Sequence, residues 1–169
     1  MNSFLKLLLG VLIFNKGPQD FPHSITLMRI CLLGYFVTGL PSVMTHAGLE
    51  KAILAMALDV ALLMLFVYFC LQAFSKSARY IQTITSLAFV GVFFQILMYP
   101  LVSEIGVDVK QGDPTLSLIL LVAIWMFSIY VYIFKESFSI RLPAAIGLVI
   151  CYGFMSQIIS SLLFPELIQ

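Results

Sequence analysis

Five long apolar runs, separated by short connections, constrain this chain more than any other feature of its sequence. Each run is long enough to cross the roughly 30 Å hydrocarbon core of a bilayer as a helix, which takes about 20 residues. A helix also pairs its own backbone amides, as lipid requires. We therefore expect an all-α integral membrane protein with five transmembrane helices in a single membrane domain, at approximately residues 23–41, 51–74, 79–102, 115–134 and 140–164.

The composition supports a bilayer rather than water as the main solvent. Of the 169 residues, 62% are hydrophobic and 10% are charged, whereas a soluble domain has about 25% charged and about 45–50% apolar residues. The net charge is only +1. The chain therefore has no basic surface of the kind that binds nucleic acid, and we expect no nucleic-acid partner.

The first apolar block, residues 2–16, is too short to span a bilayer. About 13 helical residues rise only about 20 Å. Ser3, Lys6 and Gly10 recur at helical spacing and form a narrow polar stripe, which predicts an interfacial helix lying on the membrane. A signal peptide is the alternative, but GPQDFP follows at 17–22 in place of a cleavage site with small residues.

The distribution of lysine and arginine predicts the orientation, because cells retain these residues in cytoplasmic loops. Placing the N-terminus in the cytoplasm leaves only Lys51 and Lys110 on the far side. Five spans then place the C-terminus on the far side. The seven basic residues on or near the cytoplasmic side are Lys6, Lys16, Arg29, Lys76, Arg79, Lys135 and Arg141.

Asp59 is the one acidic residue well inside an expected span. A carboxylate at membrane depth is rare and is a hypothesis of function by default. It needs a partner or a proton, and Arg29 of the first span has a side chain long enough to reach toward it. Asp59 and Arg29 are thus a candidate pair, which either anchors two helices or forms part of a proton or ion relay.

Polar side chains form two layers when depth is counted at about 1.5 Å per residue. One lies near the cytoplasmic end of the third span, and the other includes Gln95 in the third span and Gln157 in the fifth at similar depth. Hydrogen bonds between helices are one interpretation; a polar pocket for a lipid headgroup or small solute is the other. The candidate residues are Gln82, Thr83, Gln95, Gln157, Ser156 and Ser160.

Motifs for catalysis, metal binding or cofactors are absent from the sequence. His23 and His46 stand alone near opposite boundaries, and the cysteines Cys31, Cys70 and Cys151 lack CxxC spacing. We expect these cysteines to be small buried apolar side chains. Neither a GxSxG turn nor a phosphate-binding glycine loop occurs. The sequence therefore predicts no metal, no cofactor and no enzymatic activity, with His46 and Glu50 as the one weak alternative pair.

The short N-terminal segment, the five closely spaced spans, GPQDFP at 17–22 and YIQTITSL at 80–87 resemble small bacterial proteins of the Yip-domain family. The resemblance covers residues 20–164 approximately. It implies a multi-pass protein of the bacterial inner membrane, and in that membrane the orientation given by the basic residues would place the C-terminus in the periplasm. Eukaryotic relatives interact with Rab-type GTPases, but their DLxGP motif has no match here, so GTPase binding is not implied.

Two functional hypotheses follow. The first is a non-enzymatic scaffold or accessory subunit that works through lateral helix contacts with membrane lipid, another membrane protein or a second copy of itself. It rests on the small size of the loops outside the bilayer and on the polar residues of the third and fifth spans. The second is a small transporter or a proton or ion pathway that uses Asp59.

Overall fold

The computed structural model describes residues 2–104 and 114–164, and this part of the chain is helical, with no strand. Five helices are long and apolar enough to cross a membrane, as predicted, because α2 contains two of them, Ile25–Thr45 and Gly48–Ala73. The elements are α1 (Asn2–Leu12), η1 (Pro18–Asp20), α2 (Ile25–Ala73), η2 (Ser77–Arg79), α3 (Tyr80–Glu104), α4 (Pro114–Phe138) and α5 (Leu142–Leu163).

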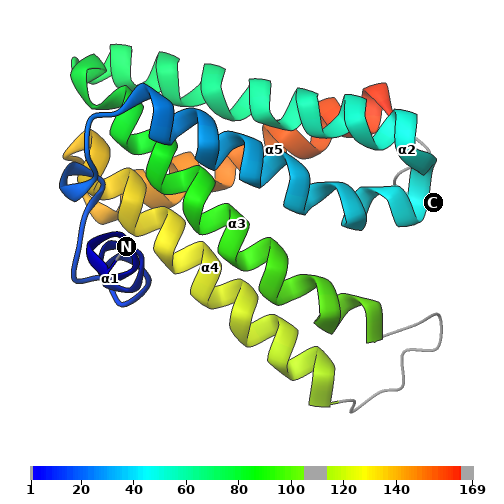
Figure 1. Cartoon of the computed structure of the whole chain (residues 1–169). Coiled ribbons are helices and arrows are strands. Elements are labelled where there is room, and N and C mark those ends of the chain that lie inside the picture. The colour runs from blue at the N-terminus through cyan, green and yellow to red at the C-terminus, as the bar shows by residue number, and fades with distance from the viewer. Residues whose placement is uncertain (1, 105–113, 165–169) are drawn as a thin grey trace.

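The two halves of α2 fold back on each other at Gly48 (Figure 1). The expected connection at residues 42–50 is therefore much shorter than predicted. Gly48 has φ 74° and ψ 169°, a backbone conformation that only glycine adopts readily. Pro41 lies inside the helix and does not end it. Gly48 thus forms the vertex of a helical hairpin that links the first two spans.

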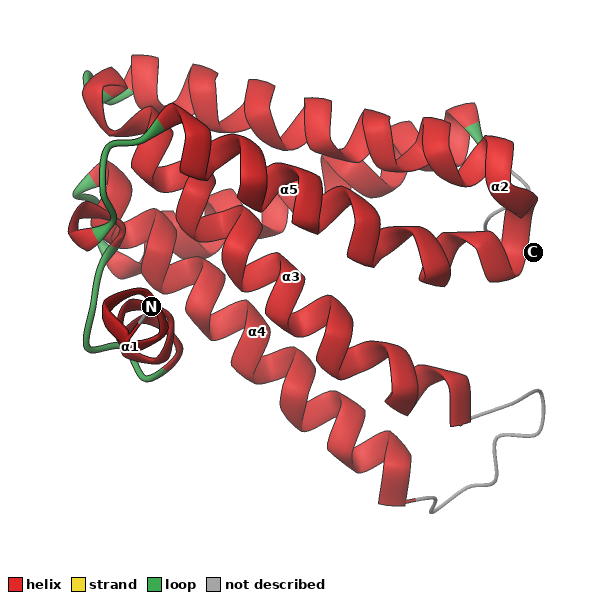
Figure 2. Ribbon diagram, in the orientation of Figure 1, coloured by secondary structure: helices red, strands yellow, loops and turns green. Residues whose placement is uncertain are grey.

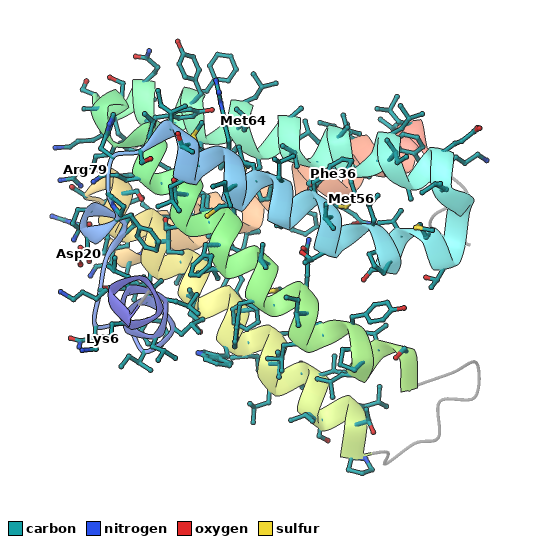
Figure 3. The ribbon with its side chains drawn as sticks, in the orientation of Figure 1. Lys6, Asp20, Phe36, Met56, Met64 and Arg79 are labelled. Atoms are coloured by element: carbon teal, nitrogen blue, oxygen red, sulfur yellow. The ribbon has the colours of Figure 1, made fainter. Side chains whose placement is uncertain are left out.

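The bundle has two ends of different character. The start of α2, the α2–α3 connection and the α4–α5 connection lie at one end, and Gly48 and the last turn of α3 lie at the other (Figures 1 and 2). We call the first the basic end, since every described lysine and arginine except Lys51 lies there or within about one turn of it. Figure 3 shows Lys6 and Arg79 among these residues. The opposite end is called the far end.

Helix α1 lies at the basic end and runs in a different direction from the long helices. In Figure 1 it is seen almost along its axis, whereas the long helices run across the picture. It ends at Leu12, four residues earlier than predicted, because Phe14 takes φ 59° and the Asn15 and Lys16 amides both donate to the Gly10 carbonyl. Leu12 is buried, and its carbonyl accepts a hydrogen bond from Trp125 Nε1 of α4 at 3.2 Å. These contacts fix α1 against the bundle.

Helix α3 has a larger share of its span buried than the other four described spans. Ile84, Leu87, Val90 and Phe94 are fully buried along it. Its first turns also hold polar side chains that bond to other elements, because an unpaired polar group is costly in an apolar interior. Gln82 Nε2 donates to the Phe21 carbonyl at 2.8 Å and thereby holds the η1 segment.

The end of α4 is held by a basic side chain. Arg79 Nη1 donates to the Glu136 carbonyl at 2.8 Å, the Ser137 carbonyl at 3.3 Å and Ser139 Oγ at 3.1 Å. Close by, Thr83 Oγ1 donates to Ser137 Oγ at 3.0 Å. The last carbonyls of a helix have no partner within it and carry partial negative charge. Arg79 supplies the missing donors and a compensating charge.

Candidate functional site

Asp59 lies on the second half of α2, and three hydroxyl groups from two other segments surround its carboxylate. Tyr35 Oη, on the first half of α2, donates to Oδ2 at 2.6 Å. Tyr152 Oη and Ser156 Oγ, both on α5, donate to Oδ1 at 3.4 Å each. The 2.6 Å distance lies within the ordinary range for an O–H···O hydrogen bond. Both carboxylate oxygens are therefore occupied by neutral donors.

The Tyr35 ring reaches Asp59 because α3 has a glycine opposite it. A Cβ atom placed on Gly91 would lie 2.5 Å from both Cδ2 and Cε2 of Tyr35, and 3.4 Å from Tyr130 Oη. Real Cβ atoms do not approach other atoms so closely. Gly91 thus lets the tyrosine ring rest on the α3 backbone with its hydroxyl directed at the carboxylate.

The predicted pair between Arg29 and Asp59 is not formed. Counting from the hairpin vertex at Gly48, Asp59 is eleven residues away and Arg29 nineteen. The difference of eight residues separates them by about 12 Å along the helices. Arg29 is exposed near the basic end. Tyr35, thirteen residues from the vertex, lies at the depth of Asp59 and takes the place predicted for Arg29.

Asp59 borders a cavity of about 1290 Å³ that lies between α2, α3, α4 and α5. The cavity reaches the far end, where Thr45 ends the first half of α2 and Ser103 precedes the last residue of α3. In Figures 1 and 2, α3 and α4 diverge from α2 toward this end. Most of the lining is apolar, and its polar side chains are Tyr35, Ser42, Thr45, Asp59, Gln95, Tyr99, Ser103, Tyr130, Tyr152 and Gln157.

The polar residues singled out in the third and fifth spans divide between two roles. Gln95 and Gln157 both line the cavity, but no hydrogen bond joins them in the described part of the chain; Gln95 Oε1 instead accepts from Thr38 of α2. Ser156 bonds Asp59. Gln82 and Thr83 make their contacts at the basic end. Ser160 lies farther along α5, half-buried and outside the cavity lining.

The residues considered for metal, redox or acid–base chemistry do not assemble into a site. No group of three histidine, cysteine or acidic side chains is close enough to hold a metal ion in the residues that the structure describes. Cys31 is buried as predicted, but Cys70 is half-buried and Cys151 is exposed. In a span, such exposure places the thiol toward lipid or another helix. The His46 side chain, considered with Glu50, lies outside the described residues.

From the sequence alone, no tyrosine was singled out as a candidate site residue. In the structure, Tyr35, Tyr130 and Tyr152 line the cavity wall that holds Asp59, and Tyr35 and Tyr152 donate hydrogen bonds to its carboxylate. A signal was present, since Tyr35 and Asp59 lie at nearly equal distances from Gly48. That count requires knowing that the connection is a tight vertex.

No family model, no curated protein and no solved structure matches this chain. The Yip-domain resemblance therefore gains no support beyond the sequence strings that suggested it. The class of protein defined by the structure is an all-helical chain with five helices that could each cross a membrane. Its functional interpretation rests on the cavity and Asp59.

Proposed function

We propose that this chain is a non-enzymatic multi-pass protein of the bacterial inner membrane that binds an amphipathic molecule, such as a lipid, in the cavity beside Asp59. In this proposal the basic end faces the cytoplasm and the far end the periplasm, in agreement with the positive-inside rule. The bacterial setting in this proposal comes from the Yip-domain likeness.

The observation that carries the proposal is the combination of a large apolar cavity with a few polar groups around one carboxylate. Binding sites for small molecules are typically concave and mostly apolar, with a small number of polar groups that orient the ligand. A volume of about 1290 Å³ is sufficient for an amphipathic ligand of that kind. Gln95, Gln157 and Ser156, which a purely lateral scaffold would use for helix contacts, border this cavity or its carboxylate.

A lateral role remains part of the proposal as a consequence of binding. A protein that holds a lipid or similar molecule can present it to another membrane protein or to a second copy of itself. The accessory role predicted from the small loops is thus kept, and the cavity supplies its ligand.

A transport role is the second candidate, and the reach of the cavity from the far end to Asp59 favours it. A transporter needs an aqueous route to its intramembrane charge, and in this second proposal the cavity would supply that route from one side. It would also require access from the basic end in another conformation.

Filling the cavity should remove the bound molecule. Gly153 lines the cavity and a Cβ at this position has open space around it, so we use Gly153→Trp to place a large ring at the cavity wall. We expect native mass spectrometry to detect a bound amphipathic molecule on the wild-type protein released from nanodiscs. The Gly153→Trp variant should lose most of it.

Gly147→Trp is the matched control, because Gly147 is on the same helix, also has open space at its Cβ and does not line the cavity. This variant should retain the bound molecule. Equal retention by both variants would place the molecule outside the cavity, and a wild-type protein that carries none would contradict the proposal.

Water access and orientation can be measured together by cysteine labelling in a background without native cysteines. Gln157→Cys lines the cavity, whereas the adjacent Ile158→Cys is exposed at equal depth outside it. We expect a membrane-impermeant thiosulfonate reagent, added to the periplasmic side of spheroplasts, to label Cys at 157 and not at 158. Labelling only from the cytoplasmic side would reverse the orientation. Labelling from both sides would favour transport, and no labelling at 157 would exclude an aqueous route.

A further inference from the structure

The charge on the cavity wall is unbalanced. Among the described residues that line the cavity, Asp59 is the only charged side chain, and no lysine, arginine or histidine accompanies it. Two basic residues, Arg29 toward the basic end and Lys51 toward the far end, are each eight residues from the depth of Asp59, about 12 Å along the helices. Within the part of the cavity wall that the structure describes, Asp59 is therefore the one charged group that an entering molecule meets.

The carboxylate is arranged to remain an acceptor. Tyr35, Tyr152 and Ser156 all supply hydroxyl hydrogens to its two oxygens. Hydroxyl donors reduce the cost of keeping an ionised carboxylate away from water, but they do not neutralise it. A cation placed beside Asp59 would complete the pair, whereas an anion would be repelled.

The surroundings of Asp59 also suit a weakly hydrated positive group. Tyr35, Tyr130 and Tyr152 contribute aromatic rings to the same part of the wall, and the negative face of such a ring attracts cations. The rest of the lining is mostly apolar, so a small, strongly hydrated metal ion would lose more hydration than the wall replaces. An organic cation with an apolar body matches both parts of the cavity.

We propose that the cavity selects amphipathic monocations, with the positive group of the ligand beside Asp59 and its apolar body among the side chains toward the far end. This inference rests on the proposed function and specifies the ligand class of the same cavity. It assigns to Asp59 the role of a counter-ion that determines specificity.

Tetraphenylphosphonium and tetraphenylborate test the charge directly, because they have nearly the same shape and opposite charge. Binding of each radiolabelled ion is measured by equilibrium dialysis, with the full chain in nanodiscs of zwitterionic phosphatidylcholine and empty nanodiscs as the blank. We expect the wild-type protein to bind the phosphonium ion and to bind the borate at least about tenfold more weakly, the factor that corresponds to 1.4 kcal/mol.

Asp59→Asn should weaken phosphonium binding by about tenfold or more, because it removes the charge and keeps the size of the side chain. Asp59→Glu should retain much of the binding. Glu136→Gln is the matched control, since it makes the same chemical change at the basic end, where Glu136 pairs with Lys135 at 3.1 Å, and it should bind as the wild type does.

Equal binding of the two ions by the wild type, or unchanged phosphonium binding by a folded Asp59→Asn variant, would overturn the inference. If Asp59→Asn does not fold, the comparison of phosphonium and borate binding by the wild type alone tests the cation selectivity. Binding of neither ion, with an amphipathic molecule still detected on the wild type and lost in Gly153→Trp, would overturn cation selectivity and leave the proposed function standing. If neither ion binds and the wild type carries no amphipathic molecule, both the cation selectivity and the proposed function are overturned.

Discussion

Gly91→Ala is expected to destabilise the protein by about 2–3 kcal/mol, in the upper part of the range for an extra methyl group in a packed interior. The added Cβ would lie 2.5 Å from two atoms of the Tyr35 ring, and a ring is too rigid to yield as a flexible chain end would. Tyr35 must move, and its hydrogen bond to Asp59 is lost or lengthened. The free energy of unfolding, measured in mixed micelles with increasing SDS, gives the change.

Gly147→Ala on α5 is the control for the intrinsic effect of the substitution, since its Cβ meets nothing within 4 Å. Alanine in an open helical position is favoured over glycine by roughly 0.5–1 kcal/mol, so this variant should be as stable as the wild type or slightly more stable. A Gly91→Ala variant as stable as Gly147→Ala would show that the Tyr35 ring does not rest on α3.

Arg79→Ala should cost about 2–3 kcal/mol in the same unfolding measurement. The substitution removes charged donors to two carbonyls in the last turn of α4 and to Ser139 Oγ. Hydrogen bonds that involve a charged group contribute about 1.5–3 kcal/mol. The positive charge at a helix C-terminus adds roughly 0.3–1 kcal/mol.

Arg141→Ala provides the comparison for Arg79→Ala, because Arg141 carries the same charge at the same end. Its side chain is exposed and makes no capping hydrogen bond to α5. We expect this variant to change stability by less than about 0.5 kcal/mol, as surface substitutions usually do. Similar losses in both variants would mean that net charge, and not the cap on α4, explains the effect.

The spans were predictable because a membrane helix is defined by a property of nearly every residue in it. Apolar character over about 20 residues is a summed signal, and each predicted run overlaps a helix long enough to cross. The ends were less predictable. The first span was expected to end at Pro41 and the third at residue 102, but both helices continue beyond these residues. A proline inside a membrane helix is tolerated because neighbouring groups can pair with the backbone atoms that it frees.

The sequence singled out Asp59 and three polar residues that lie beside it or line its cavity, Ser156, Gln95 and Gln157, but not the tyrosines or the bonds to the carboxylate. Asp59 stands out in sequence because a charge in an apolar run is rare. Its partners depend on how the helices are rotated about their axes and on which residues share its depth, and both depend on the vertex at Gly48 and the close approach at Gly91. Side-chain length alone favoured Arg29 as the partner of Asp59, whereas the depth count from Gly48 favours Tyr35.

The contact between Trp125 and the end of α1 has a practical consequence. The chain contains one tryptophan, and its indole nitrogen bonds the Leu12 carbonyl while its ring lies edge-on to Phe93 and Phe94. Intrinsic fluorescence from this protein therefore comes from a single reporter at a known junction. Its emission maximum records, without any attached dye, whether the N-terminal segment is seated on the rest of the molecule.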